Sequence, residues 1–117
     1  MMLTILKSKI HGAIVTQSNV DYRGSITIDE ALMEASGILP YEKVLVADVT
    51  SGERVETYAI AGAQGSGVIG ANGATAKVIK VGDKVLIMAF AQMTPVEAKK
   101  FKPKIIIVDG RNRISRS

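Results

Sequence analysis

The 117-residue sequence contains no cysteine and no tryptophan, and it has only two phenylalanines and three tyrosines. Without cysteine, disulfide bonds and zinc–thiolate sites are excluded, which fits a reducing compartment. The single histidine, His11, has no partner histidine or cysteine, so we expect no metal site. Few aromatic rings and scattered basic residues argue against nucleic acid as a partner. No apolar run is long enough to span a membrane and no charged-then-apolar leader is visible, so we expect no membrane partner and a cytoplasmic location.

What remains is an ordinary globular composition, with 47% apolar and 22% charged residues. The length predicts one domain, residues 1–117, with a core that is small for a monomeric enzyme and makes assembly reasonable. The net charge of +4 is compatible with nucleic acid, with an anionic small substrate, or with neither. No phosphate-loop or dinucleotide fingerprint is present.

The residue pattern is typical of a mainly β protein. Polar and apolar residues alternate within residues 3–17, which predicts a strand with Lys9 and His11 on one face. Asp29 reads as the N-cap of a short helix that ends at Gly37. Further strands are expected at 26–28, 43–50, 53–61, 84–91 and 104–109, and a turn at 51–52 joins the second and third of them into a hairpin. A glycine-rich loop is expected over 62–74, and a second helix begins with a capping box at 94–97. The basic tail after residue 109 is expected to be frayed.

One weak internal repeat is present. Glu42-Lys43-Val44-Leu45-Val46 resembles Asp83-Lys84-Val85-Leu86-Ile87. Two related half-units would suit a small barrel with pseudo-twofold symmetry, although any two amphipathic strands can look alike.

The Gly24-Ser25 bond is the most informative feature of the chain. Glycine leaves its carbonyl uncrowded and tolerates strained backbone angles, so the next hydroxyl can approach that carbonyl. Attack by the Ser25 oxygen converts the amide to an ester, and β-elimination followed by hydrolysis leaves a pyruvoyl group. The dipeptide alone is weak evidence, because Gly-Ser is usually a turn.

Polar residues on the second strand of the predicted hairpin form a candidate site. Arg54 and Tyr58 share a face, whereas Thr57 points the other way. The three serve one pocket only if the strand bulges or if the pocket draws on both faces at a subunit boundary. Asn72-Gly73-Ala74 ends the glycine-rich segment, where free backbone N–H groups can approach a carboxylate. Each of these residues also has an ordinary structural interpretation.

Taken together, the short motifs resemble those of the bacterial aspartate 1-decarboxylases, pyruvoyl enzymes that make β-alanine for pantothenate. Two positions depart from the family pattern: Gly12 stands where a basic residue is common, and Thr75 where alanine is common. The motifs that carry the resemblance are Lys9-Ile10-His11, Tyr22 with Gly24-Ser25, Gly52 with Arg54, Thr57-Tyr58-Ala59-Ile60, Asn72-Gly73-Ala74 and Val81-Gly82-Asp83.

The resemblance implies a six- to seven-stranded double-psi β-barrel with two short helices, assembled as a homotetramer with sites at subunit interfaces. It also implies self-cleavage between Gly24 and Ser25 into fragments 1–24 and 25–117, with a maturation factor in some relatives. The only cofactor implied is the pyruvoyl group made from Ser25, with no metal and no pyridoxal phosphate.

The implied reaction is decarboxylation of L-aspartate to β-alanine and CO₂ through a Schiff base with the pyruvoyl group. Tyr58 is expected to be the proton donor, and Arg54 to hold the β-carboxylate, because a cation on the α-carboxylate would oppose its loss. Lys9 adds positive potential, and Thr57 hydrogen-bonds the Gly24 carbonyl during cleavage and can also touch substrate. Further substrate contacts are expected from Gly73, Ala74 and Thr75, and support for the site from His11, Tyr22 and Asn72.

Two other classes of function remain open from the sequence. One is a non-catalytic small β-barrel binding module for an anionic ligand or nucleic acid, which predicts salt-dependent binding to polyanions. The other is a structural subunit whose glycine-rich loop packs against a partner. Both predict an intact chain.

Overall fold

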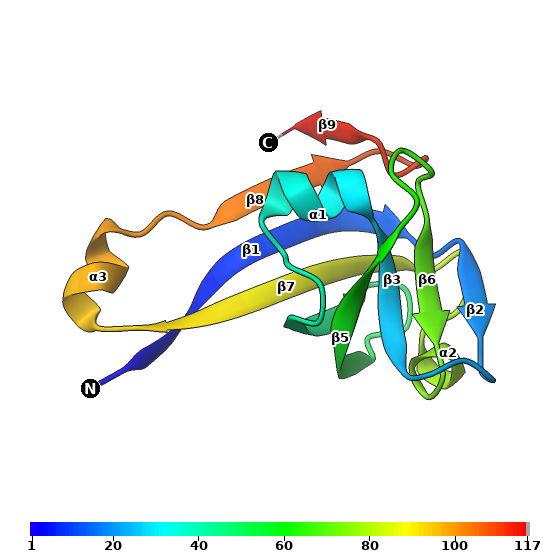
Figure 1. The fold of residues 1–117 in the computed structure, drawn as a ribbon, viewed down its shortest axis with the longest axis horizontal. Coiled ribbons are helices and arrows are strands. Elements are labelled where there is room, and N and C mark those ends of the chain that lie inside the picture. The colour runs from blue at the N-terminus through cyan, green and yellow to red at the C-terminus, as the bar shows by residue number, and fades with distance from the viewer. Residues whose placement is uncertain (117) are drawn as a thin grey trace.

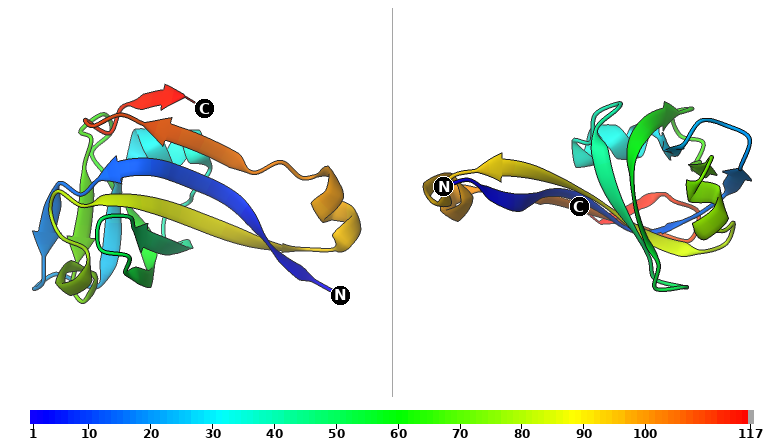
Figure 2. Two further views of the ribbon diagram at one scale, coloured as in Figure 1. Left: turned by 180° about the vertical axis from the view of Figure 1, so that it is seen from behind. Right: turned by 90° about the horizontal axis from the view of Figure 1, so that it is seen from below.

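The computed structural model describes residues 1–116, which form one nine-stranded sheet in the order β2-β6-β3-β5-β4-β7-β1-β8-β9. The sheet curls around an apolar core at one end of the molecule, and β1 and β7 run out as an arm at the other (Figures 1 and 2). The strands are β1 (Leu3–Ile14), β2 (Gln17–Asn19), β3 (Ser25–Asp29), β4 (Lys43–Asp48), β5 (Arg54–Gly62), β6 (Ile69–Asn72), β7 (Lys84–Met93), β8 (Lys104–Val108) and β9 (Ile114–Arg116); the helices are α1 (Glu30–Ser36), α2 (Thr75–Val78) and α3 (Pro95–Lys100).

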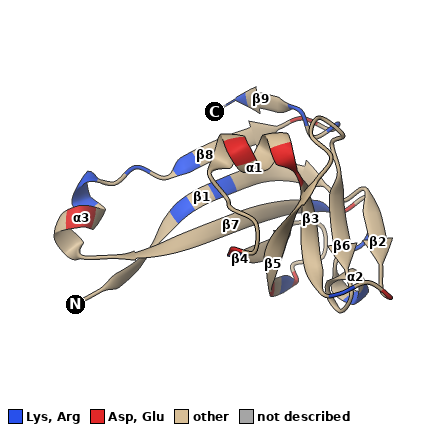
Figure 3. Cartoon of the chain, in the orientation of Figure 1, with Lys and Arg blue, Asp and Glu red and all other residues tan. Residues whose placement is uncertain are grey.

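The arm consists of two long antiparallel strands, paired from Leu3 opposite Met93 to Ile14 opposite Lys84. Helix α3 lies at its tip and begins with the predicted capping box at Thr94 and Glu97. The arm accounts for the elongated shape, 42 × 28 × 24 Å. Lys and Arg are spread over β1, β8 and α3 and do not form one continuous basic face in the view of Figure 3.

The core is built from aliphatic side chains of the curled part of the sheet, among them Ile10, Ile26, Ile69 and Ile87, all fully buried. Helix α1 packs Leu32 onto this core. Burying a side chain of this size stabilises the fold by about 1.5–3 kcal/mol.

Asp29 caps α1 as predicted and also secures the segment before β6. Its carboxylate accepts hydrogen bonds from the N–H groups of Ala31 (2.9 Å), Gly65 (2.9 Å) and Gly67 (2.7 Å). Burial acts to raise the pKa of Asp29, but the three backbone donors outweigh it and lower the pKa. The glycine-rich segment is therefore held in place electrostatically.

The two copies of the internal repeat lie on β4 and β7, which pair with each other antiparallel. The equivalent residues Val46 and Ile87 are directly opposite, and the pair Leu45–Met88 is mirrored by Leu86–Ala47. This register is what a local twofold axis requires, so the pairing supports two related half-units.

The mainly β class is confirmed, although residues 1–116 contain nine strands and three helices where six to seven strands and two helices were expected. The additional elements are short. The prediction of a loop over 62–74 was wrong for residues 69–72, because they form β6. Strand β6 consists of Ile69-Gly70-Ala71-Asn72, all buried, between β2 and β3.

The prediction of a frayed tail was also wrong for residues 110–116, because β9 pairs with β8. Buried Asn112 anchors this segment: its side chain accepts from the Ile14 N–H (2.8 Å) and donates to the carbonyls of Ile14 (2.8 Å) and Gly67 (2.7 Å).

Candidate functional site

Ser25 begins β3 and lies between two other predicted site residues. It pairs with Asn72 on β6. On the other side, the parallel ladder with β5 starts at Ile26 and Ala59, so Ser25 and Tyr58 are the residues just before it. Because Ile26 and Ala59 point into the core, strand alternation directs Ser25 and Tyr58 to the opposite face. Three adjacent strands thus bring Asn72, Ser25 and Tyr58 side by side.

The Ser25 hydroxyl is buried and held by hydrogen bonds. It accepts from Asn72 Nδ2 at 3.0 Å and donates to the Arg23 carbonyl at 3.3 Å, and the residue is 1% exposed. Asn72 Nδ2 also donates to Thr27 Oγ1 at 2.9 Å, which fixes the amide. A serine hydroxyl that is oriented and shielded from water therefore lies directly after the Gly24 carbonyl.

Gly73 packs tightly against the segment that precedes Ser25. A Cβ at Gly73 would lie 2.7 Å from both N and Cα of Gly24 and 2.8 Å from the Tyr22 carbonyl oxygen, and its φ is +62°. Only glycine permits this approach. The Gly73 N–H donates to the Asn19 carbonyl at 2.8 Å. By contrast, nothing lies within 4 Å of a Cβ placed on Gly24, so the side-chain direction of Gly24 is open.

Thr57 and Tyr58 point to opposite sides of β5, as predicted. The ladder from Lys43–Tyr58 to Ala47–Arg54 runs without a register shift, so the bulge considered above is not present between these residues. Thr57 is opposite Val44, which is buried. Of the two ways in which both residues could serve one pocket, the subunit boundary is the one that remains.

Lys9 and His11 lie on β1, while Arg54 lies on β5, and all three share the outer face of the sheet. In register, Arg54 pairs with Ala47, Ala47 with Leu86, and Leu86 with His11. Three strand spacings separate β1 from β5, about 14 Å. Lys9 and His11 therefore lie three strands away from Arg54 in the order of the sheet.

The remaining predicted residues surround the turn after β6 or lie near the start of the chain. Ala74 is exposed and Thr75 is buried at the start of α2, and Tyr22 is exposed. Gly12 has φ +87° at a β-bulge after His11. A basic residue there would have to adopt this strained conformation.

Sequence reasoning missed Tyr41, whose ring stacks on that of Tyr58. The ring centroids are 6.2 Å apart and the planes are inclined by 29°. One signal was available: in Leu39-Pro40-Tyr41-Glu42 a tyrosine follows the proline of a turn.

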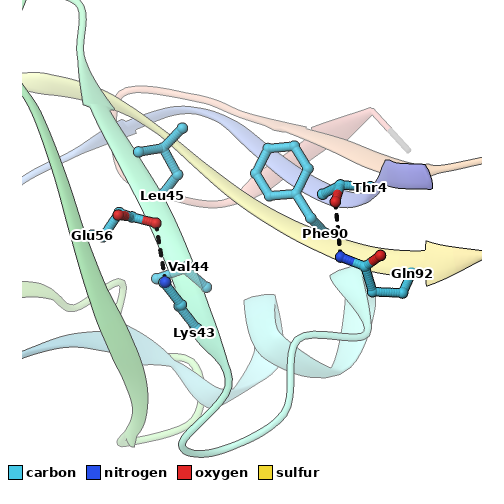
Figure 4. Close-up of a pocket in the computed structure, with 7 residues that line it drawn as sticks. All are labelled: Thr4, Lys43, Val44, Leu45, Glu56, Phe90 and Gln92. Atoms are coloured by element: carbon cyan, nitrogen blue, oxygen red, sulfur yellow. Dashed lines mark hydrogen bonds and ion pairs between the residues drawn. The ribbon is translucent and has the colours of Figure 1, made fainter. Parts of the chain in front are cut away.

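A pocket of about 280 Å³ lies between the arm and the β4–β5 hairpin (Figure 4). It contains the Lys43–Glu56 ion pair (3.2 Å) and the hydrogen bond from Gln92 to Thr4 (2.8 Å). None of the predicted site residues lines it.

No group of three or more His, Cys, Asp or Glu side chains within residues 1–116 is arranged to hold a metal ion. None of the helices described is long and apolar enough to cross a membrane.

Comparison with known proteins finds one family over nearly the whole chain. Residues 1–115 match the model of the aspartate decarboxylase family. The chain is 60% identical over 116 residues to an aspartate 1-decarboxylase of Lactiplantibacillus plantarum, covering 99% of this chain and 89% of that protein. It is 56% identical to the enzyme of the same name from Ruminiclostridium cellulolyticum (99% and 91% covered) and 54% identical to that of Carboxydothermus hydrogenoformans (97% and 90%).

Proposed function

This chain belongs to the aspartate decarboxylase family, and we propose that it decarboxylates L-aspartate with a pyruvoyl group made from its own Ser25. The reaction is that of an aspartate 1-decarboxylase, which releases the α-carboxylate of aspartate as CO₂ and leaves β-alanine. A non-catalytic binding module is not favoured, because relatives named for this activity cover nearly the whole chain.

The observation that carries the pyruvoyl proposal is the buried Ser25 hydroxyl, oriented by Asn72 at 3.0 Å beside an open Gly24. The Ser25 oxygen adds to the Gly24 carbonyl carbon, the Gly24–Ser25 amide bond breaks, and the serine nitrogen takes the proton. Loss of the Ser25 α-proton and of the Gly24 carboxylate leaves a dehydroalanine, and water then displaces ammonia to give the ketone. The residues present therefore fit this group.

Three neighbouring residues assist the cleavage in this proposal. Asn72 donates to the Ser25 hydroxyl and holds it in place. The close approach of Gly73 to Gly24 restrains the bond to be broken. Thr57 hydrogen-bonds the Gly24 carbonyl across a subunit boundary, because within one subunit it lies on the face of β5 opposite to Tyr58.

Substrate recognition is assigned to basic side chains. Arg54 binds the β-carboxylate with its planar, bidentate guanidinium group, so the α-carboxylate is free to leave. Lys9 adds positive potential, and His11 and Tyr22 support the site. Because Thr57 and Tyr58 point to opposite faces of β5, we propose a homotetramer with sites at subunit interfaces.

Backbone contacts to the substrate come from Gly73 and Ala74, with Thr75 next to them. In the uncleaved chain the Gly73 N–H donates to Asn19. This amide therefore binds substrate only after that hydrogen bond is exchanged.

Tyr58 supplies the proton that replaces CO₂ at Cα. Its position beside Ser25 in the sheet supports this role. The pyruvoyl group supplies the electron sink for the electrons that CO₂ leaves behind. We place the enzyme in the cytoplasm, in keeping with its lack of cysteine.

An intact mass spectrum of the denatured protein tests the proposal. We expect two fragments, residues 1–24 and 25–117, the second with a pyruvoyl N-terminus. The Ser25→Ala variant should remain a single inactive chain; its cleavage, or an active wild-type enzyme that is uncut, would overturn the proposal. Repeating the measurement on protein synthesised from purified components separates self-cleavage from cleavage that needs a maturation factor.

A further inference from the structure

Residues 39–42 form a tight turn in which a tyrosine occupies the position that favours glycine. The Glu42 N–H donates to the Leu39 carbonyl at 3.1 Å, Pro40 is at the second position, and Tyr41 at the third has φ +71°. A type II turn needs a positive φ at this third position, which is why glycine or asparagine is usual there. A tyrosine in this conformation is strained.

The turn is fixed to β5 immediately after Tyr58. The Tyr41 N–H donates to the Ala59 carbonyl at 2.7 Å, and the Ala59 N–H donates to the Glu42 carbonyl at 3.0 Å. The Glu42 carboxylate accepts from the Leu39 N–H at 2.9 Å and pairs with Lys7 at 2.6 Å. The backbone of the turn is thus held by contacts that do not require an aromatic side chain at residue 41.

The Tyr41 side chain makes little contribution to the core of the subunit. The residue is 77% exposed, and its ring stacks on that of Tyr58, with centroids 6.2 Å apart. Stacked aromatic pairs at this distance are attractive. Local backbone strain that packing does not explain is typical of functional positions.

We propose that Tyr41 is a positioning residue for Tyr58, an inference that rests on the proposed role of Tyr58 as proton donor. Its ring covers one face of the Tyr58 ring, restricts the rotation of that side chain, and so keeps the phenol directed at the carbon to be protonated. The strained turn holds the Tyr41 ring in place.

The test is the Tyr41→Gly variant, in which stability and kcat are expected to change in different directions. Glycine relieves the strain at φ +71°, so the melting temperature of the processed enzyme should stay level or rise. The kcat should nevertheless fall about threefold to tenfold, the range expected for the loss of one stacked pair, while KM for aspartate and the extent of cleavage stay unchanged. Tyr41→Phe retains the ring and should rescue kcat. Leu39→Ala, exposed at the same turn, is the matched control and should keep the wild-type kcat.

A second readout does not depend on turnover. Because the chain has no tryptophan, its near-ultraviolet circular dichroism reports mainly on its three tyrosines. Tyr41→Gly should reduce the tyrosine band by more than the loss of one ring, since Tyr58 gains freedom. A wild-type kcat in Tyr41→Gly would overturn the inference. A tyrosine band whose intensity falls only by the contribution of one ring would overturn it as well.

A double-mutant comparison separates this inference from the function on which it rests. If Tyr58→Phe turns over at the wild-type rate, the proton-donor role itself is wrong. If Tyr58→Phe is slow, Tyr41→Gly should cause no further loss in that background, because the two residues act as one unit. An additive loss would mean that Tyr41 acts on something other than Tyr58.

Discussion

Replacing Gly73 with alanine is expected to block processing, because the added methyl group would overlap the segment that must be cleaved. In the structure this Cβ would lie 2.7 Å from Gly24 N and Cα and 2.8 Å from the Tyr22 carbonyl oxygen. All three atoms belong to the backbone, so no side-chain rotation relieves the overlap. Ordinary contact begins near 3.4 Å, and the segment must therefore move by roughly half an ångström to one ångström.

The size of the effect follows from two contributions. The φ of +62° costs alanine about 1–2 kcal/mol in stability, and the overlap adds about 1–3 kcal/mol. A displacement of about 1 Å at a reacting group slows a reaction by about 100-fold. We therefore expect Gly73→Ala to lower the free energy of unfolding by about 2–5 kcal/mol and to slow cleavage by about two orders of magnitude.

Gly65→Ala is the matched control, because it separates backbone strain from overlap. Gly65 has a similar φ of +80°, but nothing lies within 4 Å of its Cβ. The assay follows the fraction of cut chain by intact mass over time, and it measures urea unfolding in a Ser25→Ala background so that both variants stay uncut. If Gly73→Ala is cleaved as fast as Gly65→Ala, the contact between Gly73 and Gly24 does not position the scissile bond.

Three further predictions follow from the same structure. Asn72→Ala removes the donor to the Ser25 hydroxyl and should slow cleavage by up to about tenfold, since a hydrogen bond of this kind contributes about 0.5–1.5 kcal/mol; cleavage at the wild-type rate, followed by mass spectrometry, would contradict it. Arg54→Lys should raise KM for aspartate about tenfold with cleavage unaffected, because a point charge replaces the bidentate contact; an unchanged KM in steady-state kinetics would remove the assignment. Burial, followed by a hydrogen bond with Asp83 and its charge, raises the pKa of Asp48 above its ordinary 3.8. Asp48 therefore makes its full contribution to the free energy of unfolding at pH values below 3.8, and this contribution is lost as the pH rises through the raised pKa. Asp48→Asn should melt at a higher temperature than wild type by a margin that grows from pH 4 to pH 8; a constant margin in thermal scans would show that the titration of Asp48 does not matter.

The local elements of the fold could be predicted because short-range chemistry decides them. Asp29 and Gly37 bound α1, and Thr94 with Glu97 begins α3, since each cap satisfies backbone groups within its own turn. The hairpin across Ser51-Gly52 was likewise predicted and is formed by β4 and β5. The resemblance to the family also came from the order and spacing of short motifs alone.

Strands β6 and β9 could not be predicted, because nothing in their own residues requires a strand. Strand β6 is Ile69-Gly70-Ala71-Asn72, which has no alternation and three residues of weak strand preference. It is extended because β2 and β3 satisfy its backbone hydrogen bonds from both sides. For β9, the partner strand β8 and the side chain of Asn112 decide the conformation.

The sequence by itself determined which residue types are available for the chemistry: a Gly24-Ser25 bond, one arginine and one tyrosine on the same face of a strand, and no cysteine. Only the tertiary structure decided which of them meet. Ser25 and Asn72 are 47 residues apart and become hydrogen-bonded neighbours through strand pairing. Tyr41 meets Tyr58 because a turn is hydrogen-bonded to the next strand. Local patterns record the propensity of a segment, whereas contacts of this kind depend on the register between distant strands, which the buried core sets.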